Sequence, residues 1–370
     1  MNVLLTNATD IFAGGEDYVL ILGRYLARLG HRVWVSARPG HLLLRKCAEA
    51  SLPVVPVEYG DMARVFAISR VLRRAMRDRS ITIVHSNANY DRTCAAIAAA
   101  WTPARHVAGI HSSHSISHNI THAIRNRYGI SHFITDADAG RDVLLREDGI
   151  PPGKVTTVPI GIESDPDDVR AGFRARIRGE MGIDDRTVVI GNVARLVPFK
   201  GHRFLLEAAA LVVREERHVL FLIAGDGELE EDLKEHAAAL GLGDTVRFLG
   251  FRDDLREVYP AFDVYCHSSL ELASEMFPIA ILRALASALP VVSTNVGGIA
   301  AMIDEGVSGC LTAAEAPAAL ARALLGLVND PPKRSAFGRA SFALFERKYR
   351  AEIMAGNVER VYRHVMEGVR

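Results

Sequence analysis

The chain has 370 residues, 49% of them hydrophobic, and its 44 basic residues balance its 44 acidic ones. That length exceeds one ordinary hydrophobic core, so we expect two or three domains. The balanced charge argues against a general nucleic-acid binder, and the composition is not that of a disordered chain.

The first half of the chain alternates short apolar runs with amphipathic segments. It predicts strands at 3–6, 32–36, 81–85 and 132–135, and helices at 18–29 and 64–77. Such alternation indicates a parallel sheet covered by helices on both faces. The pattern breaks at 159–170, which is typical of turns and a polar linker.

The alternation then starts again. It predicts strands at 188–192, 219–224, 246–249, 264–267 and 290–293, and helices at 204–214, 229–240, 279–288 and 351–366. We therefore expect doubly wound domains at 1–165 and 166–348, and a last segment, 349–370, that crosses back to the first. Ligands of such sheets bind at the carboxyl ends of strands, and two facing sheets would form one cleft.

The cysteines and the N-terminus predict a cytoplasmic protein. No two cysteines form a CxxC pair, so we expect buried, reduced thiols at Cys47, Cys94, Cys266 and Cys310. The first residues lack the basic region and apolar core of a signal peptide. No apolar run approaches the ~20 residues that span a bilayer.

A glycine pair, Gly14-Gly15, lies between the first strand and the first helix. Paired glycines let backbone N–H groups approach a phosphate at a helix N-terminus. The loop, residues 12–16, lacks GxGxxG spacing, so a dinucleotide site is not expected. A plain tight turn is the alternative.

Two cations and an acid follow strands of the second domain. Arg195 and Lys200 stand five residues apart between a strand and a helix, as suits a diphosphate, although solvated surface cations would look the same. Glu275 precedes the helix start marked by Pro278, which places a carboxylate beside free N–H groups. The strand at 290–293 leads to a second glycine pair, Gly297-Gly298.

The order of these motifs resembles the retaining family 4 glycosyltransferases (glycosyltransferase group 1). The motifs are Arg195…Lys200-Gly201, Ala224-Gly225-Asp226-Gly227, Phe248-Leu249-Gly250, Glu275-x-Phe277-Pro278, Pro290-Val291-Val292 and Gly297-Gly298. The first half matches more loosely, through Gly14-Gly15, Gly30-His31-Arg32-Val33 and His111. The resemblance implies the α/β fold called GT-B, with two doubly wound Rossmann-like domains facing a central cleft.

The resemblance also implies roles. Arg195 and Lys200 would hold the nucleotide diphosphate and stabilise it as the leaving group. Glu275 would bind hydroxyls of the donor sugar, and His111 would face the transferred sugar. The donor site implied in this way comprises Gly14, Gly15, Arg195, Lys200, Gly225, Phe251, Arg252, Glu275, Met276, Phe277, Pro278, Ile279 and Arg283. Phe251 or Arg252 would lie by the base, backbone N–H groups at 277–279 would contact phosphate or sugar, and Gly14-Gly15 would approach phosphate or acceptor.

The sequence departs from the family at three positions. The family has a second Glu eight residues after the first, and here that position is Arg283. Arg can only donate hydrogen bonds, so it cannot receive ribose hydroxyls as a carboxylate does. Either the ribose is held differently, or another nucleotide feature is read, or activity is impaired. Ala301 and Ile160 replace a common acid and a common Asn.

Two features could indicate a metal. His114, His118 and His122 share one face of a possible helix, a spacing that metal ligands use. Asp136-Ala137-Asp138 and Asp165-Pro166-Asp167 mimic a DxD motif. We interpret the histidines as a polar helix face, the first aspartate pair as a helix cap and the second as part of the linker. The family needs no metal, so neither metal nor cofactor is expected.

A basic face marks the helix at 64–77. Four arginines, Arg70, Arg73, Arg74 and Arg77, oppose its apolar face. Such a helix in the acceptor domain could rest on anionic lipid, which would make the protein peripheral at the inner face of the membrane. A solvated face is the alternative.

The sequence therefore predicts a retaining transferase that moves a sugar from a nucleotide diphosphate donor to a hydroxyl. We expect a UDP-sugar first and GDP-mannose second. By family analogy, the acceptor is a cell-envelope glycan, such as lipopolysaccharide, or a lipid-linked polysaccharide. A nucleotide-sugar epimerase of the same fold and a non-catalytic paralogue that binds glycan or a partner are the alternatives.

Overall fold

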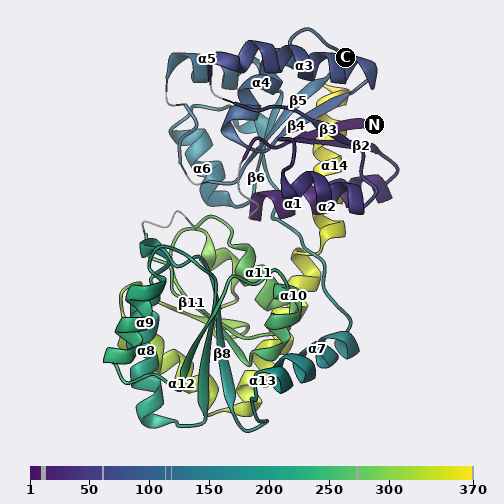
Figure 1. The fold of residues 1–370 in the computed structure, drawn as a ribbon. Coiled ribbons are helices and arrows are strands. Elements are labelled where there is room, and N and C mark those ends of the chain that lie inside the picture. Colours follow the sequence, from purple (N-terminus) through teal and green to yellow (C-terminus); the bar gives the residue numbers. More distant parts are fainter. Residues whose placement is uncertain (10–13, 61, 113, 118, 272–274, 369–370) are drawn as a thin grey trace. The chain divides into compact units, whose positions relative to one another are not determined.

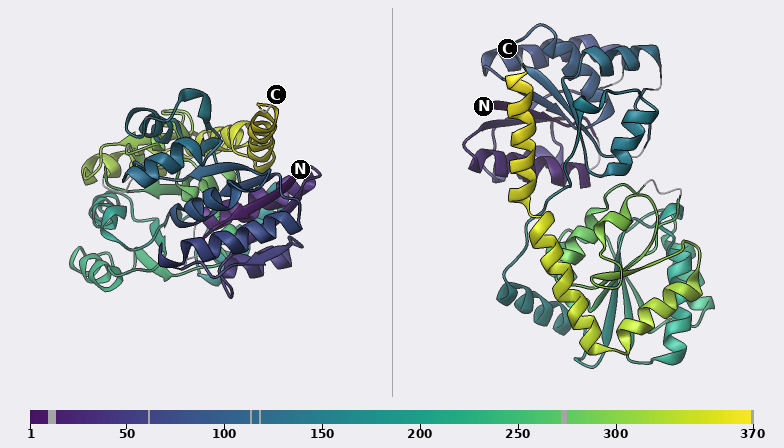
Figure 2. Two further views of the ribbon diagram at one scale, coloured as in Figure 1. Left: turned by 90° about the horizontal axis from the view of Figure 1, so that it is seen from above. Right: turned by 180° about the vertical axis from the view of Figure 1, so that it is seen from behind.

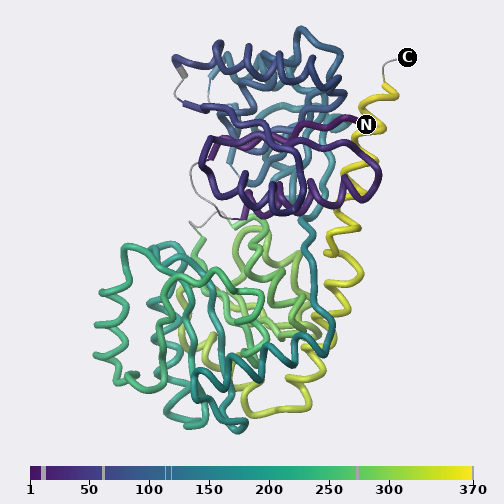
Figure 3. Tube along the Cα trace, turned by 45° about the vertical axis from the view of Figure 1, so that its right-hand side comes forward, coloured from purple at the N-terminus to yellow at the C-terminus, as the bar shows by residue number. Residues whose placement is uncertain are grey.

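The computed structural model describes residues 1–9, 14–60, 62–112, 114–117, 119–271 and 275–368. The chain divides into two compact units (Figure 1). The first unit comprises Met1–Gly161 and Arg350–Arg370, and the second comprises Ile162–Tyr349. The trace in Figure 3 shows the chain entering the first unit a second time through its last helix.

The first unit is built on a parallel sheet of seven strands in the order β3-β2-β1-β4-β5-β6-β7. Its strands are β1 (Asn2–Thr6), β2 (Arg32–Ala37), β3 (Val54–Pro56), β4 (Ile83–Ser86), β5 (Arg105–Ile110), β6 (His132–Thr135) and β7 (Val155–Thr157). Every residue of β4 and β6 is buried, as expected for inner strands of a parallel sheet.

Helices cover this first sheet. They are α1 (Gly14–Arg28), α2 (Leu42–Glu49), α3 (Val65–Asp78), α4 (Asn89–Ala99), α5 (Ile120–Tyr128), α6 (Asp138–Arg146) and α14 (Ala351–Glu367). Helix α14 packs on α1 and against β5 and β6, and α3 packs on α4 (Figure 2). The unit is therefore completed by a helix that comes from the far end of the chain.

The second unit is built on a parallel sheet of six strands in the order β10-β9-β8-β11-β12-β13. Its strands are β8 (Val188–Val193), β9 (Val219–Ala224), β10 (Val246–Gly250), β11 (Val264–His267), β12 (Val291–Thr294) and β13 (Gly309–Thr312). Its helices are α7 (Asp167–Glu180), α8 (His202–Glu215), α9 (Glu230–Ala239), α10 (Leu255–Val258), α11 (Ile279–Ala286), α12 (Pro317–Val328) and α13 (Pro331–Lys348).

Each sheet has one point at which its connections change direction. In the first unit this point lies between β1 and β4, and in the second between β8 and β11. Loops that leave neighbouring strands in opposite directions open a crevice at the carboxyl edge of the sheet. The loops after β8 and β11 are the segments that carry Arg195, Lys200 and Glu275.

Most predicted strands and helices are confirmed with ends shifted by one or two residues, and two boundaries differ by more. Strands β6, β9 and β11 have the predicted bounds. Helix α1 begins at Gly14 rather than at residue 18, so the glycine pair forms its first turn. The linker predicted at 159–170 is shorter, because Pro166 is the N-cap of α7 and Asp167 and Asp168 complement the helix dipole.

The cysteines carry free thiols, as predicted. Three of them are buried, and burial raises the pKa of Cys47 and Cys266 to about 12. Cys310 is only half-buried, so the prediction of four buried thiols was wrong there.

Among the helices that the structure describes, none is both long enough and apolar enough to cross a membrane.

Candidate functional site

The loops at the carboxyl edge of the second sheet touch one another through glycine. Gly225 follows β9 at φ +143°, and a Cβ built there would lie 1.9 Å from the carbonyl oxygen of Ala194. Gly297 follows β12 at φ +56°, and its Cβ would lie 2.0 Å from the carbonyl oxygen of Glu275. Both contacts leave no room for a Cβ, and φ +143° is open only to glycine. The φ of +56° is costly for other residues but is adopted elsewhere in this chain by Ala288. Gly225, predicted to bind the donor, here lets the loop after β9 meet the loop after β8.

Lys200 and Glu275 form an ion pair at this edge. Lys200 ends a 3-10 turn, Pro198–Lys200, and its carbonyl oxygen accepts a hydrogen bond of 2.9 Å from the Ser268 hydroxyl. Its ammonium donates to Oε1 of Glu275, which is buried. The sequence predicted that both residues bind the nucleotide-sugar donor, but it did not predict that they pair with each other.

The last residues of β11 and its loop hold the Glu275 carboxylate. Oε1 also accepts a hydrogen bond of 2.7 Å from the Ser269 hydroxyl and lies 3.4 Å from Nε2 of His267. Sequence reasoning missed both residues. Their signal was polar side chains at the end of an apolar strand, where ligands of parallel sheets bind.

The Glu275 carboxyl stays ionised although it is buried. Burial alone would raise its pKa, but the hydrogen bond from His267 and the charge of Lys200 outweigh burial and lower the pKa far below its ordinary value. Burial lowers the pKa of His267, and the Glu275 carboxylate opposes that effect. Lys200 supplies the full positive charge that pairs with the carboxylate. Oε2 of Glu275 has no hydrogen bond to any described residue and can accept from a hydroxyl.

Arg195 and Lys200 flank one aromatic ring. The Arg195 guanidinium lies 6.0 Å and the Lys200 ammonium 5.8 Å from the centre of the Phe199 ring. Arg195 is exposed and makes no hydrogen bond or ion pair with the part of the chain that the structure describes. The structure thus brings together the two predicted phosphate ligands and leaves the guanidinium available for an anion.

The segment after Glu275 offers its backbone rather than its side chains. Met276 and Phe277 are buried, and the Phe277 ring packs edge-on against Tyr349 with 5.6 Å between ring centres. Pro278 is the N-cap of α11 and supplies no side-chain hydrogen bond, so Ile279 starts a helix without a side-chain cap. Uncapped N–H groups at a helix N-terminus are suited to an anion.

The residues predicted to lie by the base differ in what they offer. The Phe251 side chain follows β10 and is 71% exposed, so its ring is free to stack. The Arg252 guanidinium makes two hydrogen bonds to the Asp254 carboxylate, of 2.7 and 2.5 Å, which raise the pKa of Arg252. Arg252 is therefore already engaged.

Arg283 is half-buried on α11. It lines a small hollow together with Glu163, Asp165, Arg256 and Tyr259. Arg256 binds Asp165 there, and the Tyr259 hydroxyl donates to the Ala280 carbonyl oxygen over 3.0 Å. The position where the family has its second Glu is here part of a mixed-charge cluster.

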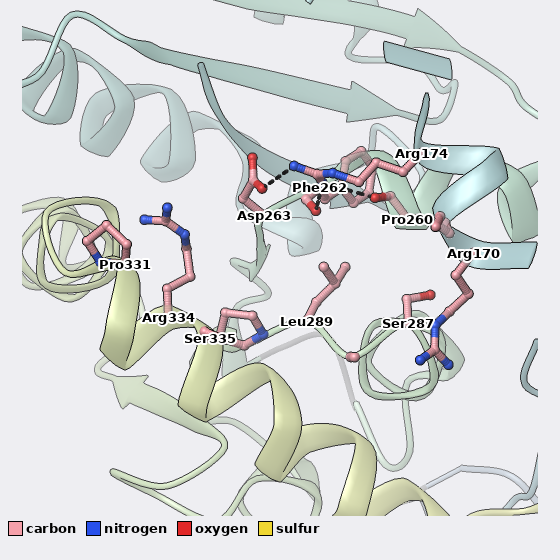
Figure 4. A pocket seen from close by; sticks show the side chains of 13 residues that line it. Arg170, Arg174, Pro260, Phe262, Asp263, Ser287, Leu289, Pro331, Arg334 and Ser335 are labelled. Atoms are coloured by element: carbon pink, nitrogen blue, oxygen red, sulfur yellow. Dashed lines mark hydrogen bonds and ion pairs between the residues drawn. The ribbon is translucent and has the colours of Figure 1, made fainter. Parts of the chain in front are cut away.

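A larger hollow, of about 360 Å³, opens on the second unit (Figure 4). It contains no predicted donor residue, and Asp263 and Pro290 in its wall come just before β11 and β12, at the amino edge of the sheet. Arg174 donates to the carbonyl oxygens of Pro260 and Phe262 and to Asp263 (Figure 4). Arg174 thus holds the backbone that leads into β11, and we assign no ligand to this hollow.

In the first unit, His111 forms a pair with Asp136. The two residues follow β5 and β6, and His111 Nδ1 lies 2.8 Å from Asp136 Oδ2. His111 Nε2 lies 3.4 Å from Asn87 Oδ1, and the Tyr18 ring stands edge-on, 4.7 Å from the imidazole. The sequence predicted that Asp136-Ala137-Asp138 caps a helix. This was wrong for Asp136, because Ala137 is the N-cap of α6.

The His111 imidazole favours its charged form. Burial lowers its pKa, but the charge and hydrogen bond of Asp136 outweigh burial and raise it. Arg92 opposes this effect and Glu16 supports it. The neighbouring His85 is held neutral, because burial lowers its pKa to about 3.

The first turn of α1 already contains a carboxylate. Glu16 is buried and accepts hydrogen bonds from Asn7 Nδ2, at 3.0 Å, and from the Thr9 hydroxyl. A Cβ added to Gly15 would meet no atom of the described residues within 4 Å, so packing against them does not require this glycine. A phosphate at this helix end would meet the charge of Glu16.

Residues 1–9, 14–60, 62–112, 114–117, 119–271 and 275–368 include no group of three or more His, Cys, Asp or Glu side chains arranged to hold a metal ion. His118 of the histidine series, like residues 12 and 13 of the glycine loop, lies outside the described residues. Asp138 accepts from Thr157 over 2.7 Å, and Asp165 binds Arg256.

The Gly297→Ala variant tests the contact between loops. The left-handed φ costs a non-glycine residue about 1–2 kcal/mol, and the overlap with Glu275 adds to that cost. We expect a lower melting temperature and a displaced Glu275. Gly306→Ala is the matched control, since Gly306 has φ +72° but no atom within 4 Å of its Cβ. Equal losses in the two variants would contradict the close contact.

The Asp136→Asn variant tests the His111 pair. Without the carboxylate, burial and Arg92 should lower the pKa of His111 below its ordinary value, as followed by imidazole NMR. Because the folded pKa is raised, the wild-type pair stabilises fully below pH about 6.5 and loses this effect as pH rises through the folded pKa. Asp138→Asn, which removes a nearby carboxylate outside the pair, should leave the titration unchanged. An unaltered pKa in Asp136→Asn would refute the pairing.

Two sequence families match the chain. "Glycosyl transferases group 1" matches residues 173–343, and "Glycosyltransferase Family 4" matches residues 12–165. The D-inositol 3-phosphate glycosyltransferase 2 of Catenulispora acidiphila is 35% identical over 55% of this chain and 49% of its own length. The alpha-D-kanosaminyltransferase of Streptomyces kanamyceticus is 28% identical over 66% of this chain and 62% of its own. The chain thus spans about half the length of the first of these relatives.

Solved structures share the fold. A glycosyltransferase from Rickettsia africae superposes with a TM-score of 0.86 at 16% identity, covering 99% of this chain and 98% of the other. HepE of Anabaena, solved in complex with UDP, superposes with a TM-score of 0.83 at 20% identity. The match covers 98% of this chain and 99% of HepE. These likenesses show the GT-B fold of two Rossmann-like units. With both halves matched by glycosyltransferase families, the chain belongs to the family 4, group 1 glycosyltransferases.

Proposed function

We propose that this protein transfers a sugar from a nucleoside diphosphate donor to an acceptor hydroxyl, with retention at the anomeric carbon. The observation that carries the proposal is the cation pair of Arg195 and Lys200 on Phe199, beside the buried carboxylate of Glu275. This set stands at the carboxyl edge of the second sheet, where such sheets bind ligands.

The charges of this set fit the reaction. Breaking a sugar–phosphate bond builds negative charge on the diphosphate and positive charge on the anomeric carbon. Arg195, Lys200 and the N–H groups at the start of α11 would stabilise the negative charge. They raise the rate because the diphosphate gains charge in the transition state, so they bind it more tightly there than in the ground state.

Glu275 acts as a ligand of the sugar rather than as a nucleophile. A carboxylate whose pKa is held so low is a weak base, and its Oε2 can accept from a sugar hydroxyl. When the diphosphate arrives, it competes with Glu275 for the Lys200 ammonium. Retention without a nucleophile implies a front-face substitution, and retention itself rests on the family resemblance.

A UDP-sugar is the proposed donor, with GDP-mannose second. The solved HepE structures contain UDP and UDP-glucose, which supports this order. The proposed acceptor is a cell-envelope glycan or lipid-linked saccharide, by family analogy. The first relative is named for D-inositol 3-phosphate, so a small phosphorylated polyol belongs in the same acceptor screen.

Donor binding tests the cation pair directly. We expect UDP and one UDP-sugar to raise the melting temperature of the purified chain, because a ligand of the native state stabilises it. Arg195→Ala and Lys200→Ala should each weaken UDP binding about tenfold or more, since a charged hydrogen bond contributes about 1.5–3 kcal/mol. Arg203→Ala, on the exposed face of α8, is the control and should bind as the wild type does.

The products distinguish the alternatives. A transferase consumes acceptor and donor together, whereas an epimerase changes the nucleotide sugar without an acceptor. If no nucleotide or nucleotide sugar binds, the non-catalytic paralogue becomes the better description.

Arg283→Glu tests whether the departure from the family damages the donor site. Because Glu163 and Asp165 line the same hollow, a third carboxylate there should lower the melting temperature, and we expect no gain in transfer rate. Arg283→Gln removes the charge without adding a negative one and should be milder. A large gain of activity in Arg283→Glu would show instead that the arginine impairs donor binding.

A further inference from the structure

Exposed apolar side chains concentrate on one part of the first unit. Six of the nine large hydrophobic side chains exposed in the described residues belong to α3, to the turn after α4, or to α5. They are Phe66, Val71, Trp101, Ile120, Ile124 and Tyr128. The most exposed are Tyr128 at 77%, Phe66 at 74% and Ile120 at 72%. Exposed apolar groups that gather in this way mark an interaction surface.

Helix α5 turns its apolar stripe outward. Ile120, Ile124 and Tyr128 follow one another at intervals of four residues, which places them on one face of the helix. The polar residues Arg125 and Asn126 are buried instead. Arg125 Nη1 donates to Thr93 on α4 over 2.8 Å, so polar contacts hold the helix to its neighbour. Helix α5 therefore packs on the first unit through polar residues, and its apolar stripe is available for another contact.

Helix α3 adds arginines to this surface. Its exposed side carries Phe66, Arg70, Val71 and Arg74, while Ile68, Leu72 and Met76 pack inward. The Arg73 guanidinium lies 5.8 Å from the centre of the Trp101 ring, and Arg77 donates to the Trp101 carbonyl oxygen over 3.2 Å. The outer side of α3 and the turn after α4 therefore form one continuous surface.

The charge of this surface is one-sided although the whole chain has a formal net charge of zero. Helix α3 carries four arginines against one acid, Asp78. Helix α5 has no acid and adds one exposed arginine, Arg127, since its other arginine, Arg125, is buried. Such an excess of arginine over acidic residues favours an anionic partner over a protein surface of ordinary, mixed charge. Arginines interleaved with Phe, Ile, Trp and Tyr are the combination that anionic lipid headgroups and the acyl boundary beneath them attract.

We propose that this surface docks on an anionic lipid bilayer. We call it the α3–α5 face, defined by Phe66, Val71, Trp101, Ile120, Ile124 and Tyr128 together with the arginines of α3. The arginines bind headgroup phosphates, and the apolar side chains enter the interfacial layer. The proposal does not depend on the proposed sugar transfer, because docking is measured without donor or acceptor.

Flotation of the full chain with vesicles tests the proposal. The chain should float with vesicles of phosphatidylcholine and phosphatidylglycerol, less so as salt rises, and not with phosphatidylcholine alone. Removing one arginine should weaken binding about fivefold, since each contributes about 1 kcal/mol near an anionic surface.

Matched variants locate the contact. Arg70→Gln with Arg74→Gln should reduce the preference for anionic lipid, and Ile120→Ser with Ile124→Ser should abolish stable docking. All four side chains are exposed, so the melting temperature should be unchanged and serves as the check on folding. Arg203→Gln and Val307→Ser likewise remove a charge and an apolar side chain at exposed positions of the second unit, and they should have no effect.

Tryptophan emission gives a second measurement. Trp34 packs against the core of the first unit, whereas Trp101 is 68% exposed. Anionic vesicles should therefore shift the emission to the blue in Trp34→Phe and not in Trp101→Phe.

Three results would overturn the proposal. They are the absence of flotation, equal binding to neutral and anionic vesicles, and a self-association that Ile124→Ser abolishes without any vesicle binding. The last result would make the α3–α5 face a contact between copies of this chain.

Discussion

A buried ion pair organises the second unit. Lys200 follows β8 and Glu275 follows β11, the two strands between which the sheet changes direction. A buried carboxylate without a partner would be neutralised or would destabilise the fold. Lys200, His267 and Ser269 keep it ionised, so the loops must stay where the ligand-binding edge of the sheet needs them. Gly225 and Gly297 let the backbones of neighbouring loops at this edge come into direct contact.

The same arrangement leaves two groups unused within the described chain. The Arg195 guanidinium, which contacts the Phe199 ring, and the second oxygen of Glu275 make no hydrogen bond or ion pair with the described residues. One is a cation for phosphate and the other an acceptor for hydroxyls, which is the pairing that a sugar diphosphate requires. The ion pair thus preorganises the site and defines which ligand complements it.

Much of this could be predicted from the sequence, because apolar strands and motif spacing are local signals. Strands β6, β9 and β11 were predicted to the residue, and Arg195, Lys200 and Glu275 were named. Their partners were not, since the contact of Glu275 with Lys200 joins residues far apart in the chain. Helix α5 was missed because its pattern is inverted, with polar residues buried and apolar ones exposed. The start of α7 was missed because Pro166 followed by two aspartates signals both a turn and a helix N-terminus.

Helix α14 makes the first unit discontinuous in the chain. The Tyr362 hydroxyl lies 2.7 Å from Nδ1 of His85 on β4, and both side chains are buried. During synthesis on a ribosome, residues 1–161 therefore emerge long before the helix that covers their sheet. Residues 162–349 form an uninterrupted unit and can complete their fold first. The order of folding would then be the reverse of the order of translation. Until α14 is synthesised, the sheet of the first unit would expose apolar surface that is prone to aggregation.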